Sequence, residues 1–206
     1  QYSLDLKQIA VTDYEKLLKS QNLLPGRRIL LEEIDSRFEA IRQMGIDTAD
    51  RLKKDLSTPL KLAVFAQKSG IPEEYLVILK RELGSLEQKP VPLSSFPDMD
   101  AALLKKLEER GVLNSKDYLE NAEGTSAELD ALCDLVRING VGAVAARAFY
   151  EAGYHTAADV AHAQAETMLV RVNAVNEQKK YYNAKLGVKD MQFCIDFAVL
   201  LEKYCK

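Results

Sequence analysis

The stretch best suited to chemistry with an anion is Ile138-Asn139-Gly140-Val141-Gly142, which precedes an Ala-rich amphipathic run. Two glycines separated by a single residue permit a tight turn between helices, because glycine adopts left-handed backbone without a Cβ clash. A helix that begins near Ala143 leaves its first amides unpaired at the positive end of its dipole. Such a helix start is a common binding site for phosphate.

Cations occur on both sides of this turn and in one later segment. Arg137 and Arg147 are the nearest to the turn, and residues 179–185 alternate lysines with tyrosines, which offer charge for phosphates and rings for bases. The proposed contacts with a nucleic-acid backbone are Arg137, Gly140, Val141, Gly142, Arg147, Lys179 and Lys180. Residues 143–146 supply no basic side chain. A purely structural hairpin is therefore the alternative, as is a solvated 179–185 segment whose tyrosines fold back on neighbouring helices.

Side chains for other kinds of chemistry are sparse. The sequence contains no Gly-x-Ser-x-Gly motif, P-loop or Rossmann fingerprint. Its two histidines, His155 in a turn and His162 in a short helix, are interpreted as structural or exposed. We therefore predict no catalytic residue, no metal site and no cofactor, and a protein that is not an enzyme.

The net charge and the cysteine content restrict the kind of ligand and the cellular compartment that we expect. The 206 residues carry 28 Lys and Arg against 31 Asp and Glu, a formal net charge of −3. Any nucleic-acid contact must then come from a local patch. Three cysteines without Cys-x-x-Cys spacing predict free thiols in a reducing compartment, and no apolar run reaches the ~20 residues that cross a bilayer. We expect a cytoplasmic protein without membrane contact.

Hydrophobic periodicity and helix-start signals predict an all-α fold. Thr12 and Glu15 form a capping box that places a helix start at Thr12, and apolar residues at three- and four-residue steps predict one long helix from Arg27 to Gly45. No segment shows the period of two that strands require. Further helices are expected after Thr48, Thr58 and Pro72, and at about 100–110, 115–121, 126–137, 143–152, 156–163, 165–175 and 189–204.

A proline-containing segment divides the chain. Residues 88–95 contain Pro90 and Pro92, which bias their predecessors away from helical backbone. We predict an N-terminal helical domain over 1–87, an extended linker over 88–95 and a C-terminal helix-hairpin-helix domain over 96–206.

Three turns, centred on Gly45, Gly111 and Gly153, share their packing positions. Each has an apolar residue four before the glycine and another immediately after it. A Thr or Asn follows at the third position, and a large or branched apolar residue at the seventh. This pattern predicts a helix that ends on a left-handed glycine and a capped short helix that follows.

The hairpin that precedes the turn varies more than the turn itself. Phe96-Pro97-Asp98-Met99-Asp100 stands before Gly111 at the same spacing as residues 138–142 stand before Gly153, but aspartates replace both glycines. Carboxylates repel phosphate. The repeat keeps its packing positions and loses its anion-binding positions, so we interpret it as mainly architectural.

This arrangement resembles a bacterial family of tandem helix-hairpin-helix proteins that is catalogued only as a domain of unknown function. The resemblance implies tandem helix-hairpin-helix repeats in one or two compact helical domains, and it implies no reaction. It extends over most of the chain, and its residues are Leu24–Arg27, Gly45–Thr48, Ser69–Leu76, Ile138–Asp159, 175–177 and 186–188.

The last helix, 189–204, is apolar on two sides and must be buried on most sides. Docking in the core of its own domain is the first interpretation, and a homodimer through residues 191–204 is the alternative.

Two functions are consistent with these features. One is a non-catalytic helix-hairpin-helix module that contacts the nucleic-acid backbone without sequence specificity. The other is a protein–protein interaction scaffold of stacked helical hairpins that does not bind nucleic acid.

Overall fold

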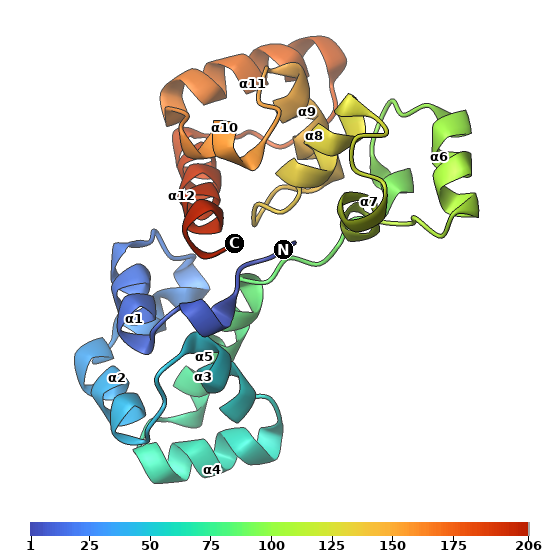
Figure 1. Ribbon diagram of the computed structural model, residues 1–206. Helices are drawn as coiled ribbons and strands as arrows, with labels where there is room; N and C mark the ends of the chain where they lie inside the picture. The colour runs from blue at the N-terminus through green and yellow to red at the C-terminus, as the bar shows by residue number, and fades with distance from the viewer. Residues whose placement is uncertain (206) are drawn as a thin grey trace. The chain divides into compact units, whose positions relative to one another are not determined.

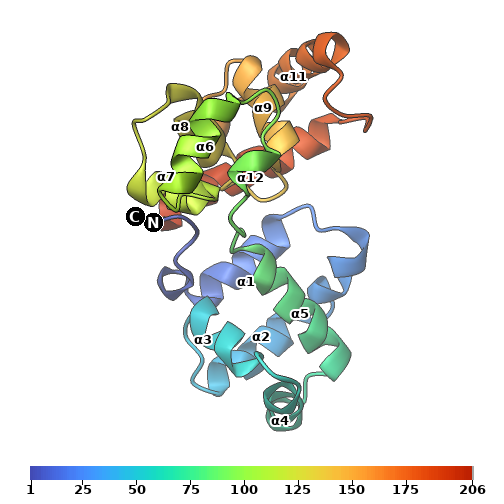
Figure 2. The same ribbon diagram turned by 90° about the vertical axis from the view of Figure 1, so that its right-hand side faces the viewer.

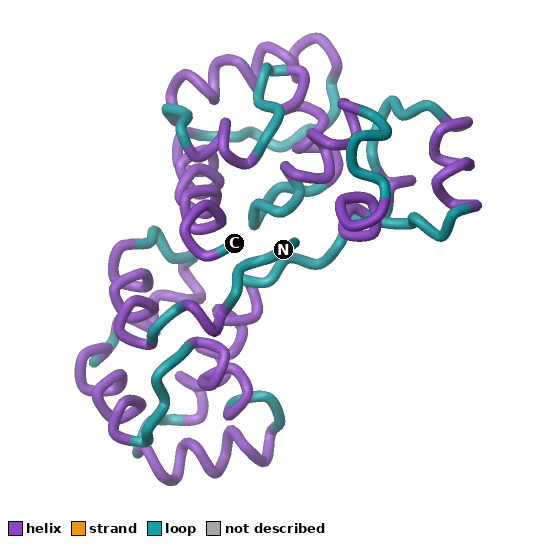
Figure 3. The backbone as a smooth tube through the Cα atoms, in the orientation of Figure 1, coloured by secondary structure: helices purple, strands orange, loops and turns teal. Residues whose placement is uncertain are grey.

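The computed structural model describes residues 1–205, and this part of the chain is built from helices (Figure 1, Figure 3). It contains no strand, only two isolated antiparallel bridges, Ala10 with Thr48 and Pro92 with Asn114. The predicted all-α class is confirmed. No helix in the described part is long and apolar enough to cross a membrane.

The chain forms two compact units. One consists of Leu4–Glu87, and the other combines Gln1–Ser3 with the chain from Gln88 onward. The division into domains 1–87 and 96–206 with a linker at 88–95 stays a prediction about independent folding.

The unit of residues 4–87 contains α-helices and 3-10 helices that pack around one core. Its most buried large side chains include Tyr14, Phe38 and Tyr75, and the Tyr75 hydroxyl donates to the Leu30 carbonyl oxygen at 2.7 Å. Its elements are η1 (Leu6–Gln8), α1 (Val11–Ser20), η2 (Pro25–Leu31), α2 (Ile34–Gln43), α3 (Ala49–Asp55), α4 (Pro59–Ser69) and α5 (Glu73–Ser85).

Two expected helix boundaries in this unit are wrong. Helix α1 begins at Val11 with Ala10 as its N-cap, because the Val11 amide donates to the Asp47 carbonyl oxygen at 2.9 Å, so Thr12 lies within the helix. The segment from Arg27 to Gly45 is not one helix. It forms η2 and α2, separated at Glu33, whose φ is +49°. This break lets both segments turn apolar residues such as Leu30 and Phe38 into the core.

The second unit contains the helices expected downstream of residue 96. Their bounds agree with the predicted ranges to within a few residues. The elements are η3 (Leu93–Ser95), α6 (Ala101–Glu109), α7 (Ser115–Asn121), α8 (Ala127–Leu135), α9 (Ala143–Glu151), α10 (Ala157–Ala161), α11 (Ala165–Lys179) and α12 (Val188–Tyr204).

Helix α12 packs against α10 and α11, and α8 packs against both α7 and α9 (Figure 2). The apolar positions of α12, among them Met191, Ile195, Phe197 and Leu201, are buried. Docking of α12 into the core of its own unit is the arrangement in the structure. Helix α6 is the least embedded of these helices, since only Leu107 in it is buried.

The three glycine-centred turns have the predicted conformation. Gly45, Gly111 and Gly153 have φ angles of +78°, +77° and +97°. The side chains of Thr48, Asn114 and Thr156 accept a hydrogen bond from the backbone amide three residues later. All nine predicted packing residues are buried, namely Ile41, Ile46, Leu52, Leu107, Val112, Tyr118, Phe149, Tyr154 and Val160.

The first amide of each capped helix also finds an acceptor, and the acceptors differ. The Ala49 amide donates to the Ile9 carbonyl oxygen at 2.9 Å, and the Ser115 amide to the Val91 carbonyl oxygen at 2.8 Å. These two bonds belong to the isolated bridges. At the third turn the Ala157 amide donates instead to the Asp134 carboxylate at 2.7 Å.

Replacement of Asp134 by alanine should lower the free energy of unfolding by about 1–3 kcal/mol. The reason is that the Ala157 amide loses its acceptor and Arg137 loses its ion-pair partner, and an unmade bond at a buried donor costs its full desolvation. Chemical denaturation measures the change. Asp196→Ala is the control, since Asp196 is exposed and accepts only from Gln192 on its own helix. Equal stability of the two variants would contradict this role for Asp134.

Candidate functional site

The turn between α8 and α9 has the geometry expected for a tight helical hairpin. Gly140 has a φ of +86°, and Gly142 is the N-cap of α9 with a φ of −86° and a ψ of −176°. Val141 between them is buried. A Cβ on Gly140 would lie 3.4 Å from a ring carbon of Phe193 in α12, so this glycine also permits a close approach to that helix.

The first amides of α9 are free. Among the described residues, the amides of Ala143, Val144 and Ala145 donate to no protein acceptor, and Gly142 has no side chain to cap them. The first turn of α9 contains no acidic residue. The equivalent turn at Asp98 differs, because the Asp100 carboxylate accepts from the Ala102 amide at 2.9 Å. The first amides of α9 can therefore donate hydrogen bonds to a ligand.

Arg147, proposed as a phosphate contact, is buried and has internal partners. Its side chain is 3% exposed. The guanidinium pairs with Glu128, donates to the Pro97 carbonyl oxygen at 3.0 Å and lies 3.1 Å from the Met99 sulfur. Arg147 thus fixes the turn at 97–99 to α8 and α9, and its charge is not presented to solvent.

Arg137 also has internal partners, one of them nearby in the sequence and two at the ends of the described chain. Its guanidinium pairs with Asp134, donates to the Tyr2 carbonyl oxygen at 2.9 Å and lies 3.1 Å from the Cys205 sulfur. Burial lowers the pKa of Arg137, but the Asp134 carboxylate outweighs it and holds the pKa above its usual value. The neighbouring Tyr2 hydroxyl is 2.6 Å from Ser115 Oγ.

Lys179 and Lys180 are exposed at the end of α11, where Lys180 is the C-cap with a φ of +51°. In the described part, no hydrogen bond or ion pair joins either lysine to residues 140–142. The adjacent Tyr181 donates to the Asp98 carboxylate at 2.7 Å. Its pKa is raised by burial and by the hydrogen bonds with Asp98 and Glu151. Tyr181 therefore folds back onto the protein between two carboxylates.

Two of the three cysteines are buried as protonated thiols. Cys133 and Cys194 are free and buried, and burial raises the pKa of each thiol to about 12. Both thiols stay protonated at neutral pH. Within the described residues, no group of three His, Cys, Asp or Glu side chains is placed to hold a metal ion.

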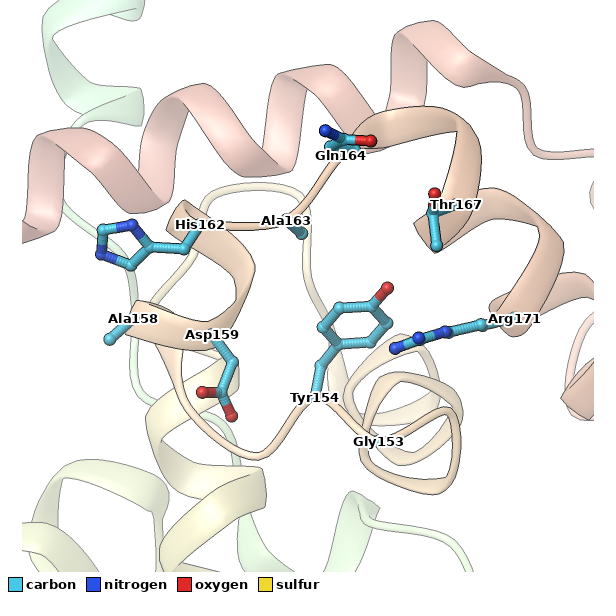
Figure 4. Close-up of a pocket in the computed structure, with 9 residues that line it drawn as sticks. All are labelled: Gly153, Tyr154, Ala158, Asp159, His162, Ala163, Gln164, Thr167 and Arg171. Carbon is cyan, nitrogen blue, oxygen red and sulfur yellow. The ribbon is translucent and has the colours of Figure 1, made fainter.

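A pocket of about 450 Å³ lies beside the Gly153 turn, between α10 and the start of α11 (Figure 4). All of its lining residues lie between Gly153 and Arg171, but none of them belongs to a sequence motif for a binding site. Its polar lining consists of Tyr154, Asp159, His162, Gln164, Thr167 and Arg171.

Residues 100–196 match the family described as "Domain of unknown function (DUF4332)". No curated protein and no solved structure matches the chain.

Gly140→Val should destabilise the protein by about 1–3 kcal/mol, since a β-branched residue is strained at a φ of +86° and its Cβ meets Phe193. Thermal unfolding measures the effect. Gly142→Ser is the control, because Gly142 has an ordinary φ and open space around its Cβ position, and serine suits an N-cap. If Gly140→Val unfolded at the wild-type temperature, the left-handed turn would be wrong.

Arg147→Ala should lower the free energy of unfolding by about 2–4 kcal/mol. The substitution removes a buried side chain and leaves the Pro97 carbonyl oxygen without its donor, and it takes the ion-pair partner from Glu128, whose side chain is 35% exposed. Arg110→Ala, at an exposed arginine of the same unit, should change it by no more than about 0.5 kcal/mol. If Arg147→Ala left the free energy of unfolding unchanged, this side chain would be free for an external ligand.

Proposed function

We propose that this protein, whose second half carries a domain of unknown function, is a non-catalytic helix-hairpin-helix module that binds another polypeptide. The observation that carries the proposal is the internal pairing of Arg137 and Arg147. These are the two cations nearest to the Gly140 hairpin in the sequence, and neither offers its charge to a ligand. A net charge of −3 supplies no long-range attraction for nucleic acid in their place.

The surface proposed for the partner lies where α12 meets the hairpin. Phe193 is 39% exposed and packs against Gly140. An exposed aromatic side chain on a rigid helix is a common anchor of protein interfaces. We define Gly140 and Phe193 as the hairpin surface. A second copy of the chain is one polypeptide that could occupy it; the homodimer through residues 191–204 is less favoured, because that helix is largely buried in its own unit.

Nucleic acid is the second candidate ligand. The free amides of α9 and the exposed Lys179 and Lys180 support it. In that case binding would rest on backbone donors with few cations, and its dependence on salt would be shallow. For either ligand we propose a cytoplasmic location, consistent with three free cysteines.

The test is affinity capture with three forms of the full chain: wild type, Phe193→Ser and Val170→Ser. Val170 lies on α11, is 70% exposed and does not belong to the hairpin surface. A polypeptide retained by wild type and Val170→Ser but lost with Phe193→Ser supports the proposal. Sedimentation at several concentrations identifies the case in which that polypeptide is a second copy of the chain. Retention of the same polypeptides by all three forms would reject this surface.

The nucleic-acid candidate is tested by fluorescence anisotropy with short duplex and single-stranded DNA at low salt. The polypeptide proposal predicts no binding. Binding that weakens with salt and is lost in Lys179→Ala and Lys180→Ala would replace it with the nucleic-acid function.

A further inference from the structure

The pocket beside the Gly153 turn has a buried tyrosine whose hydroxyl lacks a partner. Tyr154 is only 6% exposed, yet its hydroxyl makes no hydrogen bond with any described residue. Figure 4 shows this hydroxyl directed into the pocket. The ring is buried, whereas the hydroxyl oxygen itself is not enclosed and stands open to the pocket. The pocket therefore contains a donor without an acceptor.

A positive group lies over the Tyr154 ring. The Arg171 guanidinium lies over the Tyr154 ring, 5.8 Å from its centroid, and lines the pocket. Within the described part of the chain, Arg171 forms no ion pair with a carboxylate. It thus differs from Arg137 and Arg147, whose charges are neutralised inside the unit. An unpaired guanidinium favours a carboxylate or a phosphate group.

The start of α11 supplies further donors. This helix has 15 residues, and its N-cap Gln164 makes no side-chain cap. The first amides, of Ala165, Glu166 and Thr167, donate to no described acceptor, and the side chains of Gln164 and Thr167 line the pocket. The positive end of the α11 dipole and the Arg171 guanidinium therefore both attract an anion to this pocket.

The acidic groups nearby are occupied or turned away. One oxygen of the Asp159 carboxylate accepts from the amides of His155 and Thr156, at 2.9 and 3.1 Å. Figure 4 shows Asp159 and Arg171 on opposite sides of the Tyr154 ring. His162 is exposed and pairs with Glu202 at 3.0 Å. Glu166 stands in the first turn of α11 but does not line the pocket.

We propose that this pocket binds a small molecule through a carboxylate or phosphate group, held by Arg171, the Tyr154 hydroxyl and the first amides of α11. A volume of about 450 Å³ falls within the range of small-ligand sites and exceeds the need of a bare anion. The flat face of Tyr154 with Ala158 and Ala163 forms an apolar floor for the remainder of the ligand.

The experiment is a titration of the full ¹⁵N-labelled chain with inorganic phosphate and, separately, with acetate, followed by amide chemical shifts at constant ionic strength. The amides of Ala165, Glu166 and Thr167 should move progressively. Whichever anion binds more tightly identifies the group as phosphate or carboxylate.

Three variants locate the binding. Arg171→Gln should weaken it at least about tenfold, since it removes a charge-assisted bond, and Tyr154→Phe about three- to tenfold. Arg110→Gln, the control at an exposed arginine of the same unit, should bind like wild type. The proposal fails if neither anion moves these amides at tens of millimolar, or if Arg171→Gln and Arg110→Gln respond alike. Well-dispersed spectra of both pocket variants show that each is folded.

Discussion

The structure depends on the acceptors that the short helices after the left-handed glycines find for their first amides. A short helix that follows a left-handed glycine exposes donors it cannot satisfy itself. At α3, α7 and α10 a Thr or Asn side chain satisfies the third amide, and a bridge or the Asp134 carboxylate satisfies the first. These bonds connect segments that are distant in the sequence, so capping fixes the tertiary arrangement as well as the helix ends. The starts of α9 and α11 lack such acceptors, and the two candidate binding sites lie there.

Much of the fold could be predicted from local signals in the sequence. The left-handed glycines, the caps at Thr48 and Asn114 and the buried positions around them all follow from short-range chemistry. The errors arose where a distant segment competes with a local signal. The bridge between residues 10 and 48 moves the start of α1 ahead of Thr12. Burial of two apolar faces in different directions breaks the segment after Arg27 at Glu33, although its periodicity is continuous.

The site was less predictable for the same reason. The sequence correctly indicates a tight turn at Gly140, because two glycines one residue apart have a local meaning. It cannot show that Arg147 is buried, since the groups that bind it, Glu128 and Pro97, lie in two other segments. The pocket at Tyr154 is also invisible in the sequence. The position after Gly153 reads as a packing residue, and its ring does pack, while its hydroxyl and Arg171 meet only in the folded chain.

The membership of Gln1–Ser3 in the unit that begins again at Gln88 has a consequence for biosynthesis. Tyr2 is held by Ser115 and Arg137, and the Gln1 carbonyl oxygen accepts from the Cys205 thiol at 2.9 Å. A ribosome releases these partners more than a hundred residues after Tyr2. Residues 4–87 can therefore collapse around their own core while residues 1–3 have no partner, and the second unit is completed only after Cys205 has been synthesised.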